Sequence, residues 1–330
     1  MNDRSTIAIY GVGGAGINNV LDINIPSDAA GFPNAIKYIA DISDRNLRGV
    51  ADDKFAAKYL LPGVDGSGKN RVFTHSIAVA HIDKLLLTLK PKDVNVVIFS
   101  ASGGSGSVLG PLIIEELLRR DIPVIGFCII TSASKEETIN SFGTIGTLQN
   151  IATKMVKKPI VVNFHENTET CNREMVNDII HASIRALASL LSGQNEELDK
   201  RDIENWLRPD RLSVQYPPQV FDLYIHAAPG NTIMADTTAV SVASLLLSKR
   251  SIEYMGGQSY NTVGYLPDSA LNATSIELSD LHFIISNSSM VKRVDYLKSV
   301  IKVFQDAEIA AKANIVPEFD DSGDGSGWVF

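Results

Sequence analysis

Two glycine-rich loops in the first third of the chain could bind phosphate. The first is GVGGAG at 11–16, which follows the apolar run TIAIYG and precedes the helical stretch INNVLDI. The second is SGGSGS at 102–107, which follows VNVVIFSA and precedes VLGPLIIEELL. Glycine lets the backbone approach a phosphate closely, and the amides at a helix start point toward the anion. Each loop therefore has the composition and the setting of an anion-binding turn.

The first loop by itself also fits a dinucleotide site. Gly11, Gly13 and Gly16 satisfy the pattern G-x-G-x-x-G, and Asp41 ends the next predicted strand, where a Rossmann domain has its ribose-binding acid. An NAD(P)-dependent oxidoreductase is therefore one hypothesis. The second loop favours a different one. Parallel strands end at one edge of their sheet, and two helix starts at that edge suit a polyphosphate held from two sides.

A third glycine-rich stretch, GVDGSGKN at 63–70, differs by one letter from the P-loop pattern. Asn70 stands where a P-loop has the hydroxyl that binds Mg²⁺. The stretch follows Pro62 rather than a clear strand, and no strong helix signal begins at Lys69. We therefore interpret it as a flexible loop beside phosphates and not as a Walker loop.

A pair of carboxylates, Asp199 and Asp202, occurs later in the run NEELDKRDIENW. Residues three apart share one face if the segment begins a helix. Two carboxylates on one face can position and polarise a water for attack on a γ-phosphate. The same spacing equally suits acidic residues at a solvated helix start.

Other site chemistries are disfavoured. The six histidines form no H-E-x-x-H motif and no tight cluster, so we expect no metal held by protein ligands. Ser105 does not lie in a G-x-S-x-G elbow, which argues against a hydrolase nucleophile.

The elements that must position these loops alternate in the first half of the chain. Strands are predicted at 6–11, 35–41, 94–100, 123–130 and 159–164, and helices at 108–119, 138–156 and 172–191. Most of these strands are continuous apolar runs, as in a parallel sheet covered by helices on both faces. This order predicts a doubly wound α/β domain followed by a long central helix.

The pattern changes after the central helix. Strands of a second sheet are predicted at 219–227, 251–266 and 280–287, with helices at 236–249 and 290–312. We therefore divide the chain into a nucleotide-binding domain at 1–171, a central helix at 172–193, a smaller α/β domain at 194–313 and an irregular acidic tail at 314–330.

Composition limits the class of protein. The chain has 330 residues, which suits two packed domains, and its net charge of −8 makes direct nucleic-acid binding improbable. Its apolar runs are too short to span a membrane, and no signal peptide is evident. Two cysteines exclude a disulfide scaffold. We expect a soluble cytoplasmic protein.

With its three loops in this order, the sequence resembles the tubulin/FtsZ superfamily, whose signature is GGG[TS]G[TS]G. The signature here departs from that pattern at Ser102 and matches it from Gly103 to Ser107. The runs GGSGSVLGPLI, GVDGSGKNR and DISDRN look most like the phage tubulins of the PhuZ type. The resemblance covers about 5–210 by motif and the remainder by element order.

The resemblance implies that the chain binds GTP, with Mg²⁺ bound through the phosphates. It implies phosphate contacts in the first, third and signature loops. The residues concerned are Gly11, Gly13, Gly14, Ala15, Gly16, Asn18, Gly66, Ser67, Gly68, Asn70, Gly103, Gly104, Ser105, Gly106 and Ser107. Asp44 in the second loop would lie near the γ-phosphate and its Mg²⁺.

The resemblance also implies contacts to the sugar and the base. Glu137 is the candidate for a ribose contact, with Glu136 as the alternative. Asn177 matches the guanine-reading position, with Asn167 as its partner, and a carboxamide offers both a donor and an acceptor. Arg173 stands where relatives often stack an aromatic ring, and a guanidinium can stack too.

The resemblance finally implies self-assembly. In the family, the loop that carries Asp199 and Asp202 completes the site of the next subunit, so hydrolysis requires polymer. Glu197 replaces the asparagine with which relatives often begin this motif. We expect a longitudinal homopolymer in which the tail at 314–330 contacts the adjacent subunit, with lateral contacts between filaments also open. The helix at 290–312 offers the tail Lys292, Arg293, Lys298 and Lys302.

The expected role is a phage-encoded spindle that positions or moves phage DNA assemblies in the cytoplasm of an infected bacterium. Two alternatives remain open at this point. One is the NAD(P)-dependent oxidoreductase, and the other is a GTP-binding scaffold that does not polymerise.

Overall fold

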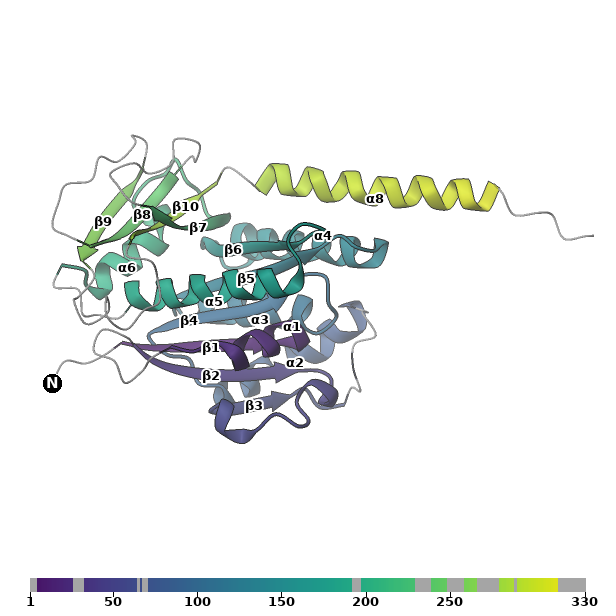
Figure 1. Cartoon of the computed structure of the whole chain (residues 1–330), viewed down its shortest axis with the longest axis horizontal. Coiled ribbons are helices and arrows are strands. Elements are labelled where there is room, and N and C mark those ends of the chain that lie inside the picture. Colours follow the sequence, from purple (N-terminus) through teal and green to yellow (C-terminus); the bar gives the residue numbers. More distant parts are fainter. Residues whose placement is uncertain are drawn as a thin grey trace, which may run out of the picture.

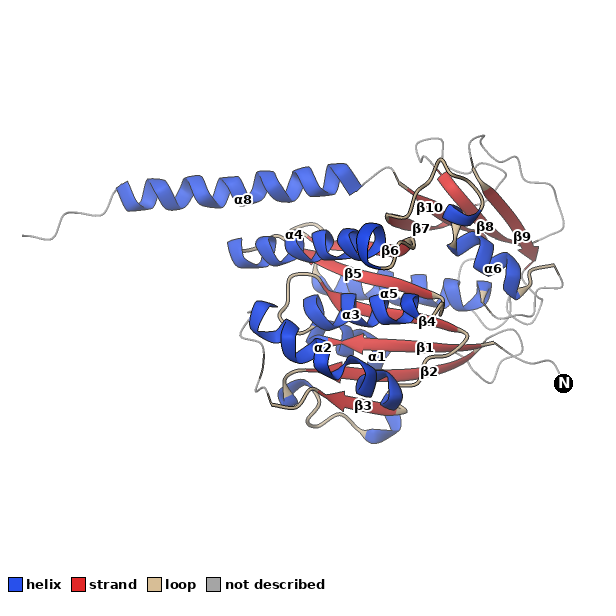
Figure 2. Cartoon of the chain, turned by 180° about the vertical axis from the view of Figure 1, so that it is seen from behind, coloured by secondary structure: helices blue, strands red, loops and turns tan. Residues whose placement is uncertain are grey.

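The chain forms one sheet of ten strands flanked by helices, in the computed structural model shown in Figures 1 and 2. The structure describes residues 5–25, 33–63, 66, 71–191, 197–228, 239–247, 258–265, 279–287 and 290–313. The strand order is β3-β2-β1-β4-β5-β6-β7-β10-β8-β9.

The bounds of the elements are as follows. The strands are β1 Thr6–Val12, β2 Asn34–Asp41, β3 Ala57–Leu60, β4 Val94–Ser100, β5 Val124–Thr131, β6 Ile160–Asn167, β7 Val220–Ala228, β8 Ala239–Leu246, β9 Tyr260–Tyr265 and β10 Asp280–Ser286. The helices are α1 Gly13–Asp22, α2 Arg71–Thr88, α3 Gly106–Arg119, α4 Lys135–Asn150, α5 Arg173–Leu190, α6 Lys200–Leu207 and α8 Met290–Ala313. Short helical turns are η1 Asp44–Asn46, η2 Asp52–Lys54, η3 Ile151–Met155 and η4 Pro209–Arg211.

Strands β1 to β6 are parallel and covered on both faces, which confirms the predicted doubly wound α/β fold. Along β4, Val96 and Ile98 enter one apolar cluster, with α1 and α5, while Val97 and Phe99 enter the other, with α2, α3 and α4. Since successive side chains of a strand point to opposite faces, a strand buried on both sides is apolar at most of its positions.

The prediction of a separate second sheet is wrong. Strand β7 pairs in parallel with β6 over three residues, from Ile160 to Val162, and β10, β8 and β9 continue the same sheet. The predicted helix at 236–249 is also wrong over 239–246, which form strand β8. All eight residues of β8 are buried between β10 and β9. A short apolar run suits a buried helix or a buried strand equally well, and here pairing with distant strands decides.

Two elements beside the third loop had no prediction. Strand β3 ends at Leu60, before the loop, and helix α2 begins at Arg71, directly after it. Both arguments against a strand–loop–helix arrangement there are therefore wrong. The signal of α2 is weak because Val72, Val79 and Leu87 are exposed, which blurs its apolar face.

Helix α8 lies beside α4 and extends past it (Figure 1). It has 24 residues, or about 36 Å at 1.5 Å per residue. Its contacts with the body include a salt bridge of 2.6 Å between Glu308 and Lys135 at the start of α4. The predicted tail at 314–330 lies outside the described residues.

Candidate functional site

Two helices begin side by side at the carboxyl edge of the sheet. Helix α1 follows β1 and helix α3 follows β4, and these two strands are neighbours. Gly13 has a φ of +69°, and a Cβ on it would lie 2.8 Å from the amide nitrogen of Gly106. A side chain at Gly13 would therefore force the first loop and the signature loop apart.

Among the residues that the structure describes, no side chain caps these two helix starts. The N-cap residues of α1 and α3, Val12 and Ser105, make no side-chain capping bond. By contrast, Ser134, Asn172 and Asp199 cap α4, α5 and α6. An uncapped helix start leaves backbone donors and the positive end of the helix dipole available to an anion. The caps are missing where phosphate contacts are predicted.

A cavity of about 320 Å³ opens beside these helix starts. Its lining includes seven residues that the sequence predicted for nucleotide binding. These are Gly14, Ala15, Asn18, Glu137, Asn167, Arg173 and Asn177. Of the two candidates for a ribose contact, it is Glu137 that lines the cavity. Gly11 and Gly16 allow backbone segments to pack closely. A Cβ on Gly11 would lie 2.6 Å from the Gly16 carbonyl oxygen, and a Cβ on Gly16 would lie 2.1 Å from the Ile98 carbonyl oxygen.

The prediction missed five lining residues: Asn46, Ser100, Ser102, Ile129 and Thr131. Ser100 and Thr131 are the last residues of β4 and β5. The rule that ligands bind at the carboxyl ends of parallel strands would have found these two. Asn46 follows β2 in the second loop, and its amide donates to Asp41 at 2.6 Å.

Two asparagines from different elements, Asn167 of β6 and Asn177 of α5, line the cavity. The Asn167 side-chain oxygen is buried, and it has no hydrogen-bond partner among the described residues. The Asn177 side chain, on α5, accepts a hydrogen bond from Asn19 on α1 at 2.9 Å. The cavity therefore combines polar groups that suit a base with the uncapped start of α1, which lies against the start of α3.

The second and third loops lie mostly outside the lining of this cavity. The Asp44 carboxylate accepts a hydrogen bond from Arg48 and does not line the cavity. Gly66 approaches the second loop, since a Cβ on it would lie 3.9 Å from Ser43. Ser67, Gly68 and Asn70 lie outside the described residues.

The signature loop is also held from the side of α2. Gly103, Gly104 and Ser105 precede α3, and the Ser107 hydroxyl donates to the Gly104 carbonyl at 3.1 Å. The Arg71 guanidinium donates to the Ser107 carbonyl at 3.4 Å and to the Thr147 hydroxyl at 3.2 Å. Burial lowers the pKa of Arg71, although this group stays charged at any ordinary pH.

Asp41 does not have the role that the oxidoreductase hypothesis requires. It is fully buried, and its carboxylate accepts hydrogen bonds from the amides of Ile42 and Ser43 and from the Asn46 side chain. Both carboxylate oxygens are thus used to order the second loop. A ribose would find neither of them exposed.

Asp199 and Asp202 lie far from the cavity of their own chain. They form a capping box at the start of α6, in which Asp199 accepts from the Asp202 amide at 2.9 Å and Asp202 from the Asp199 amide at 3.1 Å. Asp202 also accepts a hydrogen bond from Tyr260. Helix α5 separates the two regions, and its 18 residues span about 27 Å. Neither carboxylate can reach a ligand in the cavity of the same chain.

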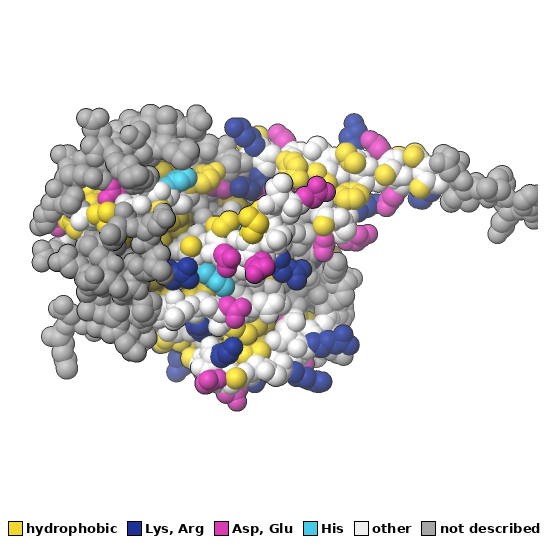
Figure 3. Space-filling view, in the orientation of Figure 1, with side chains coloured by type: hydrophobic (Ala, Val, Ile, Leu, Met, Phe, Trp, Pro, Cys, Tyr) yellow, Lys and Arg dark blue, Asp and Glu magenta, His cyan; other side chains and the backbone are white. Residues whose placement is uncertain are grey.

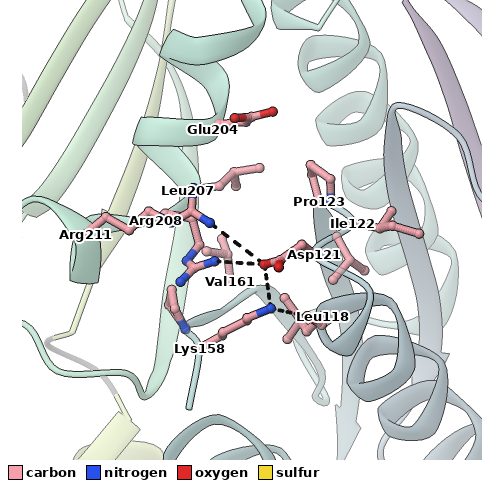
Figure 4. Close-up of a pocket in the computed structure, with 12 residues that line it drawn as sticks. Leu118, Asp121, Ile122, Pro123, Lys158, Val161, Glu204, Leu207, Arg208 and Arg211 are labelled. Atoms are coloured by element: carbon pink, nitrogen blue, oxygen red, sulfur yellow. Dashed lines mark hydrogen bonds and ion pairs between the residues drawn. The ribbon is translucent and has the colours of Figure 1, made fainter. Parts of the chain in front are cut away.

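A second cavity, of about 330 Å³, lies at the opposite edge of the sheet, where β5 and β6 begin and α6 packs (Figure 4). None of the residues predicted for nucleotide binding lines it. Asp121 forms ion pairs there with Lys158 at 2.5 Å and with Arg208 and Arg211 at 3.8 Å each. These cations lower the pKa of Asp121, chiefly through the hydrogen bond from Lys158. The cluster ties the α6 region to the end of α3.

The described part of the chain has neither a cluster of metal ligands nor a membrane-spanning helix. No group of three His, Cys, Asp or Glu side chains in this part of the chain comes together as a metal site. Among the described helices, none has both the length and the apolarity needed to cross a membrane.

The chain is similar to proteins of known class, although no family model matches it. A phage tubulin-like protein of Pseudomonas phage 201phi2-1 is 30% identical over 271 residues, which are 82% of this chain and 84% of that protein. The structure of the phage tubulin PhuZ with GDP is 27% identical, with a TM-score of 0.81, and the match covers 98% of this chain and 99% of that one. The PhuZ201 filament is 26% identical, with a TM-score of 0.78 and the same coverage.

Proposed function

The chain belongs to the phage tubulin-like proteins, and we propose on this basis that it binds and hydrolyses GTP and assembles head-to-tail into filaments. The observation that carries the proposal is the pair of uncapped helix starts, α1 and α3, in contact beside a cavity lined by Asn167 and Asn177. The oxidoreductase hypothesis is not supported, either by the comparisons or by the buried Asp41.

The residues of the cavity fit a guanine nucleotide. The open amides of α1 and α3 suit the phosphates, because each helix start offers donors that no side chain uses. The unpartnered oxygen of Asn167 suits the N–H groups of a guanine edge. Arg173 suits stacking on the base. Mg²⁺ would be bound chiefly by phosphate oxygens, since the described residues form no carboxylate cluster there.

Hydrolysis would require two subunits. Asp199 and Asp202 lie about one length of α5 from the cavity of their own chain, so they can act only on the nucleotide of a neighbour. In a head-to-tail polymer, the edge that carries α6 faces the nucleotide edge of the next subunit. There, the two carboxylates would orient and polarise the attacking water.

Helix α8 supports self-assembly as well. Its outer half exposes Val303 and Ile309, which are 66% and 67% accessible, and Figure 3 shows hydrophobic side chains along it. Exposed apolar side chains on a projecting helix suit a protein partner. We retain the proposal that the tail at 314–330 contacts the adjacent subunit. Arg293 is not available to it, because its guanidinium pairs with Asp222 at 2.8 Å.

In the cell, we propose that such filaments form a spindle in the cytoplasm of the infected bacterium and position or move phage DNA assemblies. This proposal rests on family membership and on the resemblance. Direct contact between the filament and nucleic acid is not part of it, because the chain is acidic.

Light scattering of the purified chain with Mg²⁺ tests the biochemical part. Scattering should rise with GTP, decay as phosphate is released, and stay flat with ATP or NADH. Electron microscopy at the maximum should show filaments. Binding of GTP without scattering would favour the scaffold that does not polymerise, and a lack of GTP binding would refute the proposal.

A further inference from the structure

A buried asparagine on α1 determines which atom of Asn177 faces a ligand. Asn19 is only 1% exposed. Its side-chain nitrogen lies 2.9 Å from the Ala15 carbonyl oxygen and 2.9 Å from the side-chain oxygen of Asn177. The two asparagines are 158 residues apart in the chain and join α1 to α5.

The orientation of both amides follows from the Ala15 carbonyl. A backbone carbonyl can only accept, so the Asn19 atom that faces it must be the NH₂ group. The two hydrogens of that group serve Ala15 and Asn177. The atom of Asn177 that faces Asn19 is therefore its oxygen. This leaves the Asn177 NH₂ group, a donor, for a ligand in the cavity that Asn177 lines.

A donor fixed at this position distinguishes two kinds of purine. Guanine and hypoxanthine have an acceptor, O6, where adenine has the amino donor N6. The Asn177 NH₂ group can donate a hydrogen bond to O6 of guanine or hypoxanthine. With adenine, it would face the N6 amino group, which is also a donor. The unpartnered Asn167 oxygen provides the complementary acceptor for the N1–H and N2–H groups.

We propose that Asn19 is a positioning residue that sets nucleotide specificity, because it holds Asn177 in the orientation that selects 6-oxopurine nucleotides over adenine nucleotides. The inference rests on the proposed function, since it concerns the same cavity.

The burial of Asn19 supports this role. Its side-chain oxygen is buried and has no hydrogen-bond partner in the described part of the chain, which is unfavourable. An apolar side chain would avoid that cost on a helix whose residues Ile17 and Val20 belong, with Ile180 of α5, to one apolar cluster. A packing role alone does not explain an amide here, whereas orienting Asn177 does.

The test compares affinities for GTP, ITP and ATP by equilibrium competition. Wild type should bind GTP and ITP far more tightly than ATP. In Asn19→Leu, which keeps the number and branching of the side-chain heavy atoms but removes the amide, Asn177 can rotate. The preference for GTP over ATP should then fall at least tenfold. ITP lacks the 2-amino group but keeps O6, so its affinity should fall by the same factor as that of GTP.

A matched control separates specificity from stability. Ile23→Ala removes a buried side chain at the end of α1 in the same cluster, so it should lower the melting temperature and leave the GTP-to-ATP ratio unchanged. Asn19→Ala is the second variant, should the leucine variant fail to fold.

The outcomes are distinguishable. If wild type does not bind GTP, the proposed function fails. If wild type selects GTP and a folded Asn19 variant keeps the same GTP-to-ATP ratio, the function stands and the inference is overturned. A loss for GTP without an equal loss for ITP would overturn it as well, since the contact would then not be to O6.

Discussion

Two glycines in α4 give a sharp test of the contact that Arg71 makes behind the signature loop. Gly143 and Gly146 lie one turn apart in the same helix. A Cβ on Gly143 would lie 2.3 Å from an Arg71 guanidinium nitrogen, whereas a Cβ on Gly146 would meet nothing within 4 Å. The same substitution, Gly→Ala, therefore has different consequences at the two positions.

The expected magnitudes follow from the contacts. Alanine in a helix interior is about 0.8–1 kcal/mol more favourable than glycine, so Gly146→Ala should stabilise the protein by about that amount. At Gly143 the same gain is offset by the displacement of Arg71. Arg71 must move away and lose its hydrogen bonds to Ser107 and Thr147, each of which contributes about 0.5–1.5 kcal/mol. Because only the end of a flexible side chain moves, no backbone strain adds to this loss.

The two alanine variants should therefore differ by about 1–3 kcal/mol in free energy of unfolding, because Gly143→Ala loses the two hydrogen bonds and Gly146→Ala does not. Urea denaturation without nucleotide measures that difference. In an Arg71→Ala background the contact is absent, so Gly143→Ala should become as stabilising as Gly146→Ala. Equal stabilisation by both substitutions in the wild-type background would refute the reasoning.

Four further predictions concern the site, the interface and the second cavity. Asp199→Asn and Asp202→Asn keep oxygens that can cap α6 but lose the negative charge. GTP binding should therefore persist while phosphate release slows at least tenfold, which corresponds to an increase of more than ~1.4 kcal/mol in the activation barrier. Unchanged GTP turnover in both variants would show that neither carboxylate takes part in catalysis. Gly13→Ala should abolish GTP binding, measured by competition, because its φ of +69° and its approach to the signature loop exclude a side chain. Asp121→Asn should lower the free energy of unfolding at pH 7 by less than about 1 kcal/mol, since the Asp121 side chain is 65% exposed. The pKa of Asp121 is lowered in the folded state, so this difference should persist at neutral pH and shrink only as the pH falls below its ordinary value of 3.8. Truncation after Ile315 should raise the critical concentration for assembly several-fold and leave GTP binding unchanged. A truncated protein that assembles at the wild-type critical concentration would show that the tail has no role in assembly.

The parts that the sequence alone determined are those in which local pattern and burial agree. Strands β1, β2, β4, β5 and β6 were predictable because a strand covered on both faces is apolar over most of its length. The two glycine-rich turns from strand to helix were predictable because a backbone that turns in close contact with its neighbours, as at Gly13 and Gly16, requires glycine. Both constraints act within a few residues of chain.

The tertiary structure alone decided the rest. Residues 239–246 have an apolar pattern that suits a helix, and they form a strand because β10 and β9 supply its hydrogen-bond partners. The DxxD pair is a capping box at the far end of α5 from its own cavity, and its distance from that cavity follows from the length of the helix. The orientation of Asn177 depends on Asn19, on another helix. The physical reason is the same in each case. Hydrogen-bond partners and distances between residues far apart in the chain are set by how the elements pack, and no local pattern records them.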